Sequence, residues 1–349
     1  MSRLSKVSPL VLELLAFAVV VLAVAAPLRL IGLADAPPGL FRDEAYEGLD
    51  AAHILQDGAR PTFLPGNNGR EPLFAYVIAL LFWPFGVGIV PIRLAAALIG
   101  ILTVVAVYLC ARSIFGRGVG LLSALLLAIA PWHIHMSRLG FRSIALPLLT
   151  VLAFYFVWQA LRTGRIWYWL GAGVSLGLSL YTYIPARIFP FVLLAAVVLW
   201  LLSREGTRSL QRVLLGTAIM LLVALLVFLP MGHYFWTAPE SFLGRAEQAS
   251  IMTSIRAGAD PYPLITENVK LTLGMFTFMG DINPRHNLPG KPIFDPFLSL
   301  AFGVGLLLAF ARIRKPAYSA LLVWLAAMLA PAVVADSAPH YLRAIGSFP

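Results

Sequence analysis

The chain has 349 residues, of which 60% are hydrophobic and 12% are charged, whereas an ordinary soluble domain is about 25% charged. Its 26 Lys+Arg and 16 Asp+Glu residues are too few to cover the surface of a water-soluble protein of this length, so the composition excludes a soluble globular fold. The formal net charge of +10 does not indicate nucleic acid binding, because the basic residues are spread between apolar runs and form no stripe or arm.

The first predicted element is the apolar run from Pro9 to about Leu33. It matches the roughly 20 residues that a membrane-spanning helix needs and is too long for the apolar region of a secretory signal peptide. Small residues at Ala23–Ala26 leave a cleaved signal peptide as the alternative interpretation. We expect an uncleaved first transmembrane helix.

A segment expected outside the membrane follows, residues 34–91, and it carries an adjacent pair of carboxylates, Asp43 and Glu44. Apolar residues after the pair recur at helical spacing, at Ala45, Leu49, Ala52 and Leu55. The spacing predicts an amphipathic helix at the membrane surface. Two interpretations of the pair are open. The carboxylates cap the helix and complement its dipole, or they serve as a general base and its partner.

An Arg-Glu pair, Arg70 and Glu71, follows the turn-forming run Asn67-Asn68-Gly69 in the same segment. The simpler interpretation is a loop held by salt bridges. The alternative is that Arg70 or Glu71 faces the same external cavity as Asp43.

Further apolar runs of spanning length are predicted to be transmembrane helices. Together with the first run there are about nine of them, near 9–33, 92–111, 119–134, 143–161, 167–184, 187–202, 211–232, 296–311 and 317–335. If the ambiguous run 73–90 does not cross, the short loops on the side of the N-terminus carry twelve basic residues and one acidic residue. The positive-inside rule then places the N-terminus in the cytoplasm and makes run 73–90, which contains Pro84, a re-entrant or surface-lying segment.

An aromatic, histidine and arginine cluster ends the third of these runs, with the sequence Pro131-Trp132-His133-Ile134-His135-Met136-Ser137-Arg138. His133 and His135 are two residues apart and face different sides of a helix, which disfavours a metal site. Arg138 and Arg142 are four apart on one helix face, so they bind either a phosphate or lipid headgroups. Arg187, in the next external turn, is a second phosphate candidate.

The second long external segment, 233–295, contains the turn-rich motif Gly280-Asp281-Ile282-Asn283-Pro284-Arg285-His286-Asn287-Leu288-Pro289-Gly290. Unpaired backbone groups cost several kcal/mol each in hydrocarbon, so this loop is expected to lie over the helices as a lid. Its composition favours substrate contact by Arg285 and His286 over a purely structural connector. His340 and Arg343 return basic groups to the outside near the end of the sequence.

In combination these motifs resemble those of bacterial glycosyltransferase family 39, in the C-type glycosyltransferase superfamily, with the protein O-mannosyltransferases and lipid A aminoarabinose transferases as relatives. The resemblance covers essentially the whole chain. It rests on the Asp43-Glu44 pair, Arg70-Glu71-Pro72, the helix end 131–138 and the loop 280–290. It implies an all-α polytopic membrane protein with a C-type glycosyltransferase-like transmembrane bundle, a single domain over 1–349 and a site on the external loops.

The resemblance also implies an activity, the inverting transfer of a monosaccharide from a polyprenyl-phosphate donor to a lipid, glycan or protein acceptor. The reaction would take place at the extracytoplasmic face of a bacterial plasma membrane. Asp43 would be the base, Glu44 would position the acceptor, and Arg138, Arg142 or Arg187 would hold the leaving phosphate. Further substrate contacts are expected from Arg70, Glu71, Asp281, Arg285, His286, His340 and Arg343.

Neither a metal nor a nucleic acid is expected as a partner, although Asp43, Glu44 and Asp281 offer oxygen ligands to a divalent cation. Family members usually carry more transmembrane helices than are predicted here, so we expect the chain to be truncated at its C-terminus. Aminoarabinose transferases have an arginine two residues before the Asp-Glu pair, where this chain has Phe41. Aminoarabinose specificity is therefore not expected.

Two functions from other classes stay open at this point. A transporter or flippase for lipid-linked sugars would also place charged groups in the membrane, but it predicts inverted repeats with paired broken helices, which the sequence lacks. The other is a non-catalytic membrane protein that binds polyprenyl lipids.

Overall fold

The computed structural model describes residues 8–203, 209–242, 244 and 250–347, so part of the predicted segment 233–295 lies outside the described residues. The described part is helical and contains no sheet. Its only extended pairings are two isolated β-bridges, which join Leu64 to Arg70 and Ser250 to Ala335. The predicted all-α class is confirmed.

The helices follow the predicted runs closely. Those of the first half are α1 (Pro9–Val19), the π-helical η1 (Val20–Ala25), α2 (Ala26–Leu30), α3 (Arg42–Gln56), α4 (Leu73–Phe85), α5 (Ile89–Phe115), α6 (Arg117–Ile129), α7 (Pro131–Arg138), the 3-10 helix η2 (Arg142–Ile144) and α8 (Ala145–Thr163). Those of the second half are α9 (Ile166–Ser179), η3 (Ile184–Ile188), α10 (Phe189–Leu202), α11 (Leu210–Thr237), α13 (Met252–Arg256), α14 (Pro261–Gly274), α15 (Pro296–Ala311), α16 (Pro316–Val333), α17 (Tyr341–Ala344) and η4 (Ile345–Ser347).

Six of the described helical segments are long and apolar enough to cross a membrane, which makes the chain a polytopic membrane protein. They are Pro9–Leu30, Ile89–Phe115, Arg142–Thr163, Ile184–Leu202, Leu210–Thr237 and Pro316–Val333. The pair α6 and α7, bent by 60°, adds a seventh if it is one span. The predicted count of about nine is not confirmed, because α9 has 14 residues and α15 has 16, fewer than the roughly 20 that a span needs.

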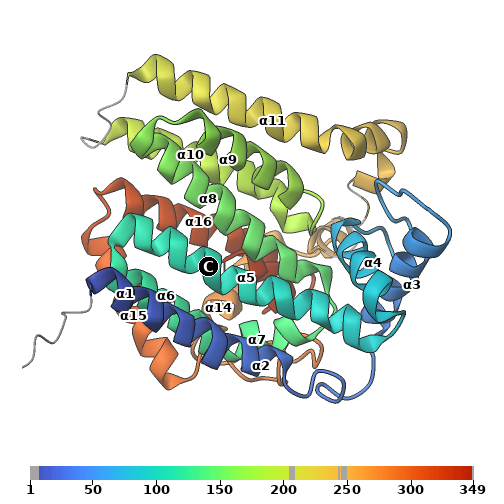
Figure 1. The fold of residues 1–349 in the computed structure, drawn as a ribbon. Coiled ribbons are helices and arrows are strands. Elements are labelled where there is room, and N and C mark those ends of the chain that lie inside the picture. The colour runs from blue at the N-terminus through green and yellow to red at the C-terminus, as the bar shows by residue number, and fades with distance from the viewer. Residues whose placement is uncertain (1–7, 204–208, 243, 245–249, 348–349) are drawn as a thin grey trace, which may run out of the picture.

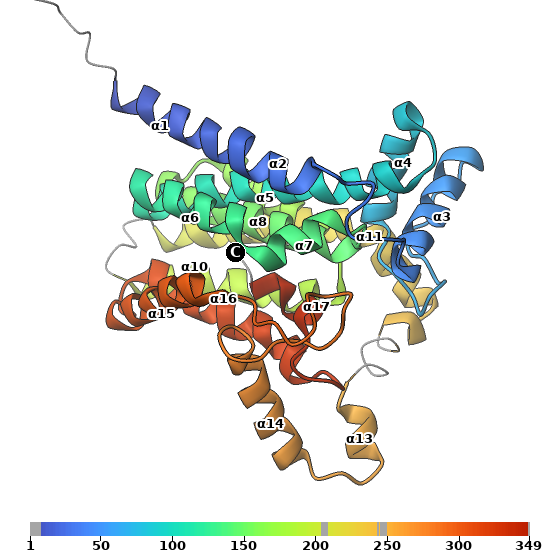
Figure 2. The ribbon, with the colours of Figure 1, turned by 90° about the horizontal axis from the view of Figure 1, so that it is seen from below.

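The long helices lie side by side in a bundle, with α5 near its middle and α11 along one edge (Figure 1). The surface helix predicted after the first span is present as α3, and it gathers with α4 at one end of the bundle. Seen from below, α13 and α14 project away from the bundle (Figure 2). The predicted site residues are divided equally between helices and the segments that connect them.

Two glycines one helical turn apart, Gly173 and Gly177, let α9 pack directly on the backbone of α11. A Cβ added at Gly173 would lie 2.6 Å from the carbonyl oxygen of Met220, and one at Gly177 would lie 2.9 Å from that of Ala224. Small residues at this spacing are typical of close helix contacts in membranes. The contact holds α11 against the rest of the bundle.

We expect Gly173→Ala to destabilise the protein by about 1–3 kcal/mol, because a backbone oxygen cannot move aside as a flexible side chain can. Thermal unfolding of the purified protein in detergent measures the change. Gly305→Ala on α15 is the matched control, since no atom lies within 4 Å of the added methyl group. Equal stability of the two variants would show that the α9–α11 contact is looser than described.

Candidate functional site

A cavity of about 770 Å³ lies where the ends of several helices meet, within the size range of small-molecule sites. Its wall combines α3, η2, η3, the end of α16 and the segments that contain Arg285 and Arg343. The residues that line it are Asp43, Glu47, Asn68, Phe141, Arg142, Ser143, Tyr183, Ile184, Pro185, Arg187, Ile188, Phe242, Ser250, Arg285, His286, Ala330, Pro331, Val334, His340, Leu342 and Arg343.

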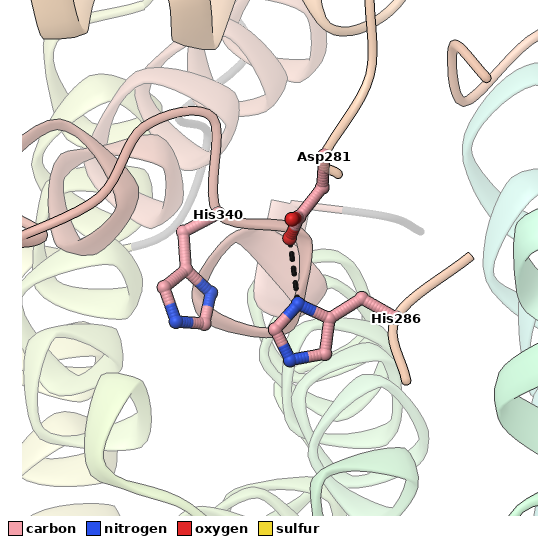
Figure 3. A group of neighbouring side chains, drawn as sticks. All are labelled: Asp281, His286 and His340. Carbon is pink, nitrogen blue, oxygen red and sulfur yellow. Dashed lines mark hydrogen bonds and ion pairs between the residues drawn. The ribbon is translucent and has the colours of Figure 1, made fainter. Parts of the chain in front are cut away.

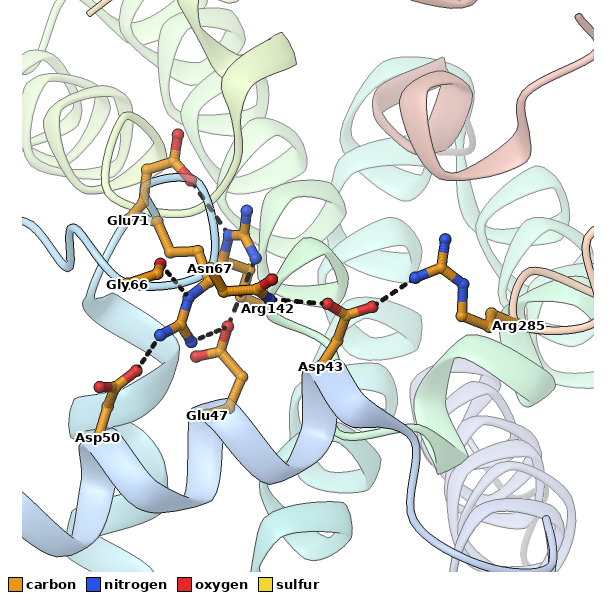
Figure 4. A network of polar contacts seen from close by, with 9 residues as sticks. Asp43, Glu47, Asp50, Gly66, Asn67, Glu71, Arg142 and Arg285 are labelled. Atoms are coloured by element: carbon orange, nitrogen blue, oxygen red, sulfur yellow. Dashed lines mark hydrogen bonds and ion pairs between the residues drawn. The ribbon is translucent and has the colours of Figure 1, made fainter. Parts of the chain in front are cut away.

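Asp43, predicted as the base, lies in the first turn of α3 and lines this cavity. Its carboxylate accepts a hydrogen bond of 3.0 Å from Asn67 Nδ2 and forms an ion pair of 2.7 Å with Arg285 Nη1 (Figure 4). The side chain is 28% exposed. A carboxylate from the segment 34–91 and a guanidinium from the segment 233–295 therefore meet on one wall.

Glu44 is buried and does not line the cavity. Its carboxylate pairs with Arg93 Nε at 3.2 Å and accepts hydrogen bonds from the backbone amides of Gly140, at 2.8 Å, and Phe41, at 3.0 Å. The capping interpretation is thus confirmed for Glu44, which satisfies a free amide at the start of α3. The adjacent carboxylates have separate surroundings, and Asp43 is the one that reaches the cavity.

A buried network of charges lies next to Asp43, one turn further along α3 (Figure 4). Glu47 is the centre of the network, at 3.3 Å from Arg70 Nη1 and 3.4 Å from Arg142 Nη1. Arg70 also pairs with Asp50, and Arg142 Nε lies 3.1 Å from Glu71. Each of these arginines is matched by carboxylates, so the network fixes the loop before α4 onto α3.

The remaining predicted arginines occupy different places. Arg138 donates to the carbonyl oxygens of Leu28, Gly32 and Ala36 and is not part of the cavity wall. Arg187 lines the cavity, stacks 4.2 Å from the ring centroid of Phe242 and also donates to the carbonyl of that residue. Its nearest described carboxylate is that of Glu71, at 3.9 Å.

Arg343, on α17, also lines the cavity, and its closest ion pair, with Asp336, is 3.9 Å long. The described wall therefore carries four arginines and two carboxylates. They are Arg142, Arg187, Arg285 and Arg343, and Asp43 and Glu47. Arg142 is matched by Glu47 and Glu71, and Arg285 is matched by Asp43. The excess positive charge therefore comes from Arg187 and Arg343. The cavity has the charge of an anion-binding site.

Asp281, His286 and His340 come together beside the cavity, although they lie on two separate segments (Figure 3). His286 Nδ1 lies 2.6 Å from a carboxylate oxygen of Asp281, and the rings of His286 and His340 stack with centroids 4.9 Å apart. Burial lowers the pKa of His340 to about 3, so its imidazole is neutral. Both histidines line the cavity, while Asp281 is buried and does not line it.

Glu47 and Arg93 are among the residues of this region that were not predicted as site residues. Glu47 lies four residues after Asp43, and that spacing could have indicated a second carboxylate on the same helix face. Arg93, which pairs with Glu44, is a lone arginine in the apolar run that became α5. An arginine inside such a run requires a buried partner, which the sequence alone does not identify.

A family model described as Dolichyl-phosphate-mannose-protein mannosyltransferase matches residues 68–234. Among curated proteins, an uncharacterized protein of Aquifex aeolicus (strain VF5) is 29% identical over 202 residues, which are 55% of this chain and 38% of the relative. The region matched by the family model, 68–234, includes η2 and η3 of the cavity wall but not the turn-rich loop 280–290.

Two solved structures share the fold over nearly the whole chain. One is the archaeal oligosaccharyltransferase AglB from Archaeoglobus fulgidus, in complex with an inhibitory peptide and a dolichol-phosphate. It has a TM-score of 0.66 and 16% identity, and the match covers 97% of this chain and 49% of the AglB chain. ArnT from Cupriavidus metallidurans, bound to undecaprenyl phosphate, has a TM-score of 0.65 and 17% identity. The match covers 97% of this chain and 58% of the ArnT chain.

The chain thus spans about half the length of these solved structures. The resemblance predicted from the sequence is confirmed, because the mannosyltransferase family model matches residues 68–234 and both solved structures share the fold.

Proposed function

We propose that this chain is the transmembrane domain of a glycosyltransferase that moves a monosaccharide from a polyprenyl-phosphate donor to a lipid, glycan or protein acceptor, with inversion. The observation that carries the proposal is the Asp43 carboxylate on the wall of a cavity that also presents Arg187, Arg285 and Arg343. A base and a group of cations at one cavity match the needs of a reaction with a hydroxyl nucleophile and a phosphate leaving group.

The donor phosphate would bind Arg187 and Arg343, whose nearest carboxylates are both 3.9 Å away. Guanidinium groups bind phosphate in a bidentate manner, and their charge stabilises a leaving phosphate. Beside them the wall is apolar, with Ile184, Pro185, Ile188, Ala330, Pro331 and Val334. This surface suits the first isoprene units of the donor. The polyprenyl phosphates bound to AglB and ArnT support a donor of this kind.

In the proposed reaction Asp43 takes the proton of the acceptor hydroxyl as that oxygen attacks the anomeric carbon of the donor. The bond between the sugar and the phosphate oxygen breaks, and the polyprenyl phosphate leaves. A single displacement of this kind inverts the anomeric configuration. Arg285 would hold the Asp43 carboxylate in position between turnovers, through the ion pair of 2.7 Å.

The proposed site is extracytoplasmic, in a bacterial plasma membrane with the N-terminus in the cytoplasm. The support is the basic composition of the short loops at the other end of the helices, which the positive-inside rule assigns to the cytoplasm. No nucleotide sugar is needed on that outer face, because the donor is carried by the lipid.

Transfer of labelled sugar from polyprenyl-phosphate hexoses, measured in membranes that contain the protein, tests the function. We expect Arg187→Met to raise the KM for the donor by about 10- to 100-fold, since a charge-assisted hydrogen bond contributes roughly 1.5–3 kcal/mol. Arg165→Met, an exposed arginine next to α9, is the control. Absence of transfer from every donor by correctly inserted wild-type protein would contradict the proposal.

A further inference from the structure

We propose that Asp281, His286 and His340 form a binding site for a divalent transition metal of the Zn²⁺ type, which joins the loop before α15 to the segment before α17. The inference goes beyond the proposed function and does not depend on it. Its basis is the mutual position of three potential ligands on two segments that are far apart in the sequence.

The three side chains offer one ligand atom each, and these atoms lie within 4.8 Å of one another. A metal bonded at roughly 2.0–2.2 Å to nitrogen and oxygen brings its ligand atoms to within about 4 Å of each other. Small side-chain rotations would therefore close the cluster around an ion. Two imidazoles and one carboxylate form a ligand set typical of Zn²⁺ and related ions, whereas Mg²⁺ and Ca²⁺ prefer oxygen ligands.

A second observation is that His340 Nδ1, which is buried, lacks a hydrogen-bond partner among the described residues. Figure 3 shows the His340 ring beside that of His286, to which the Asp281 carboxylate is bonded. A buried nitrogen without a partner is costly, and a metal bond would satisfy it.

The carboxylate of Asp281 is already oriented by the backbone. It accepts hydrogen bonds from the amides of Asn283, at 2.8 Å, and Tyr341, at 3.1 Å. Tyr341 directly follows His340, so the same contact holds the second segment next to the first. Outer contacts of this kind orient metal ligands and increase their affinity.

A metal at this site would fix the position of a loop that contributes to the cavity wall. Arg285 directly precedes His286, and its guanidinium reaches Asp43. A metal that fixes the His286 backbone would therefore fix the position from which Arg285 contacts the proposed base. Because His286 and His340 both line the cavity, a fourth coordination position would face the cavity, where water or a phosphate oxygen could bind.

The experiment uses the full chain purified in detergent, stripped with a chelator and titrated with Zn²⁺, with metal content measured after gel filtration. Co²⁺ serves as a spectroscopic substitute, since its visible absorption reports coordination by nitrogen and oxygen. Asp281→Asn, His286→Gln and His340→Gln are the variants. His53→Gln, which changes an exposed histidine on α3, is the matched control.

We expect one Zn²⁺ per wild-type chain and per control chain. In each of the three variants we expect Zn²⁺ affinity to fall by about tenfold or more, because even the loss of a residue that only contacts a metal ligand lowers affinity by this factor. Absence of Zn²⁺ and Co²⁺ binding by the stripped wild type would overturn the proposal, whatever the variants do. Binding unchanged in all three variants would overturn it as well. Both readouts are independent of sugar transfer, so failure here and failure of the proposed function are distinguishable.

Discussion

Asp43→Asn is expected to abolish sugar transfer, with a fall in kcat of about 10²–10⁴-fold, while the donor still binds. An asparagine has nearly the shape of aspartate but cannot take a proton from the acceptor hydroxyl. The donor contacts proposed for Arg187 and Arg343 are untouched by the change. The measurement is transfer of labelled sugar, together with binding of the labelled polyprenyl-phosphate donor to the same membranes.

Asp57→Asn is the matched control, because Asp57 is an exposed carboxylate at the other end of α3. It is expected to transfer sugar at the wild-type rate. Retained transfer in Asp43→Asn would remove the base from the mechanism and leave Glu47 as the only other described carboxylate on the cavity wall. Loss of both transfer and donor binding would instead assign Asp43 to substrate binding.

Glu44→Ala is expected to destabilise the protein by about 3–5 kcal/mol, the effect of removing one partner from a buried ion pair. The carboxylate is the only described acidic partner of Arg93, whose guanidinium is fully buried. The change also leaves the backbone amides of Gly140 and Phe41 without their acceptor. Thermal or denaturant unfolding in detergent, followed by circular dichroism, measures the loss.

The double variant Glu44→Ala, Arg93→Met separates the effect of the ion pair from that of the hydrogen bonds between Glu44 and the backbone. We expect it to be more stable than Glu44→Ala alone, because the unpaired buried charge is gone. Glu267→Ala, whose side chain is 60% exposed on α14, is the control and should cost less than about 0.5 kcal/mol. If Glu44→Ala matched that control, the pair with Arg93 would not stabilise the fold.

Hydropathy and helical spacing predicted the positions of the helices well, because both depend on local sequence. The predicted surface helix and α3 agree, and each predicted apolar run contains a helix. The number of membrane crossings was harder to predict. A run of apolar residues such as 167–184 includes the turn after α9, and hydropathy does not distinguish a buried turn from the end of a span.

The surroundings of individual side chains were also harder to predict, because they depend on contacts that are distant in the sequence. Arg138, Arg142 and Arg187 look alike in sequence, yet Arg138 binds backbone carbonyls, Arg142 is matched by two carboxylates and Arg187 faces the cavity. These differences depend on partners up to about a hundred residues away. Without the fold, nothing in the local sequence separates an arginine that fixes a loop from one that can bind a ligand.

The ion pair between Asp43 and Arg285 joins residues that are synthesised at different times. The two are 242 residues apart, so at roughly 5–20 residues per second about 12–50 s pass between their additions to the nascent chain. During that interval the segment that contains Asp43 is already synthesised, but the loop that contains Arg285 is not. Asp43 therefore lacks this partner until the loop before α15 has been added, and a chain whose synthesis paused within α14 would contain the proposed base without Arg285.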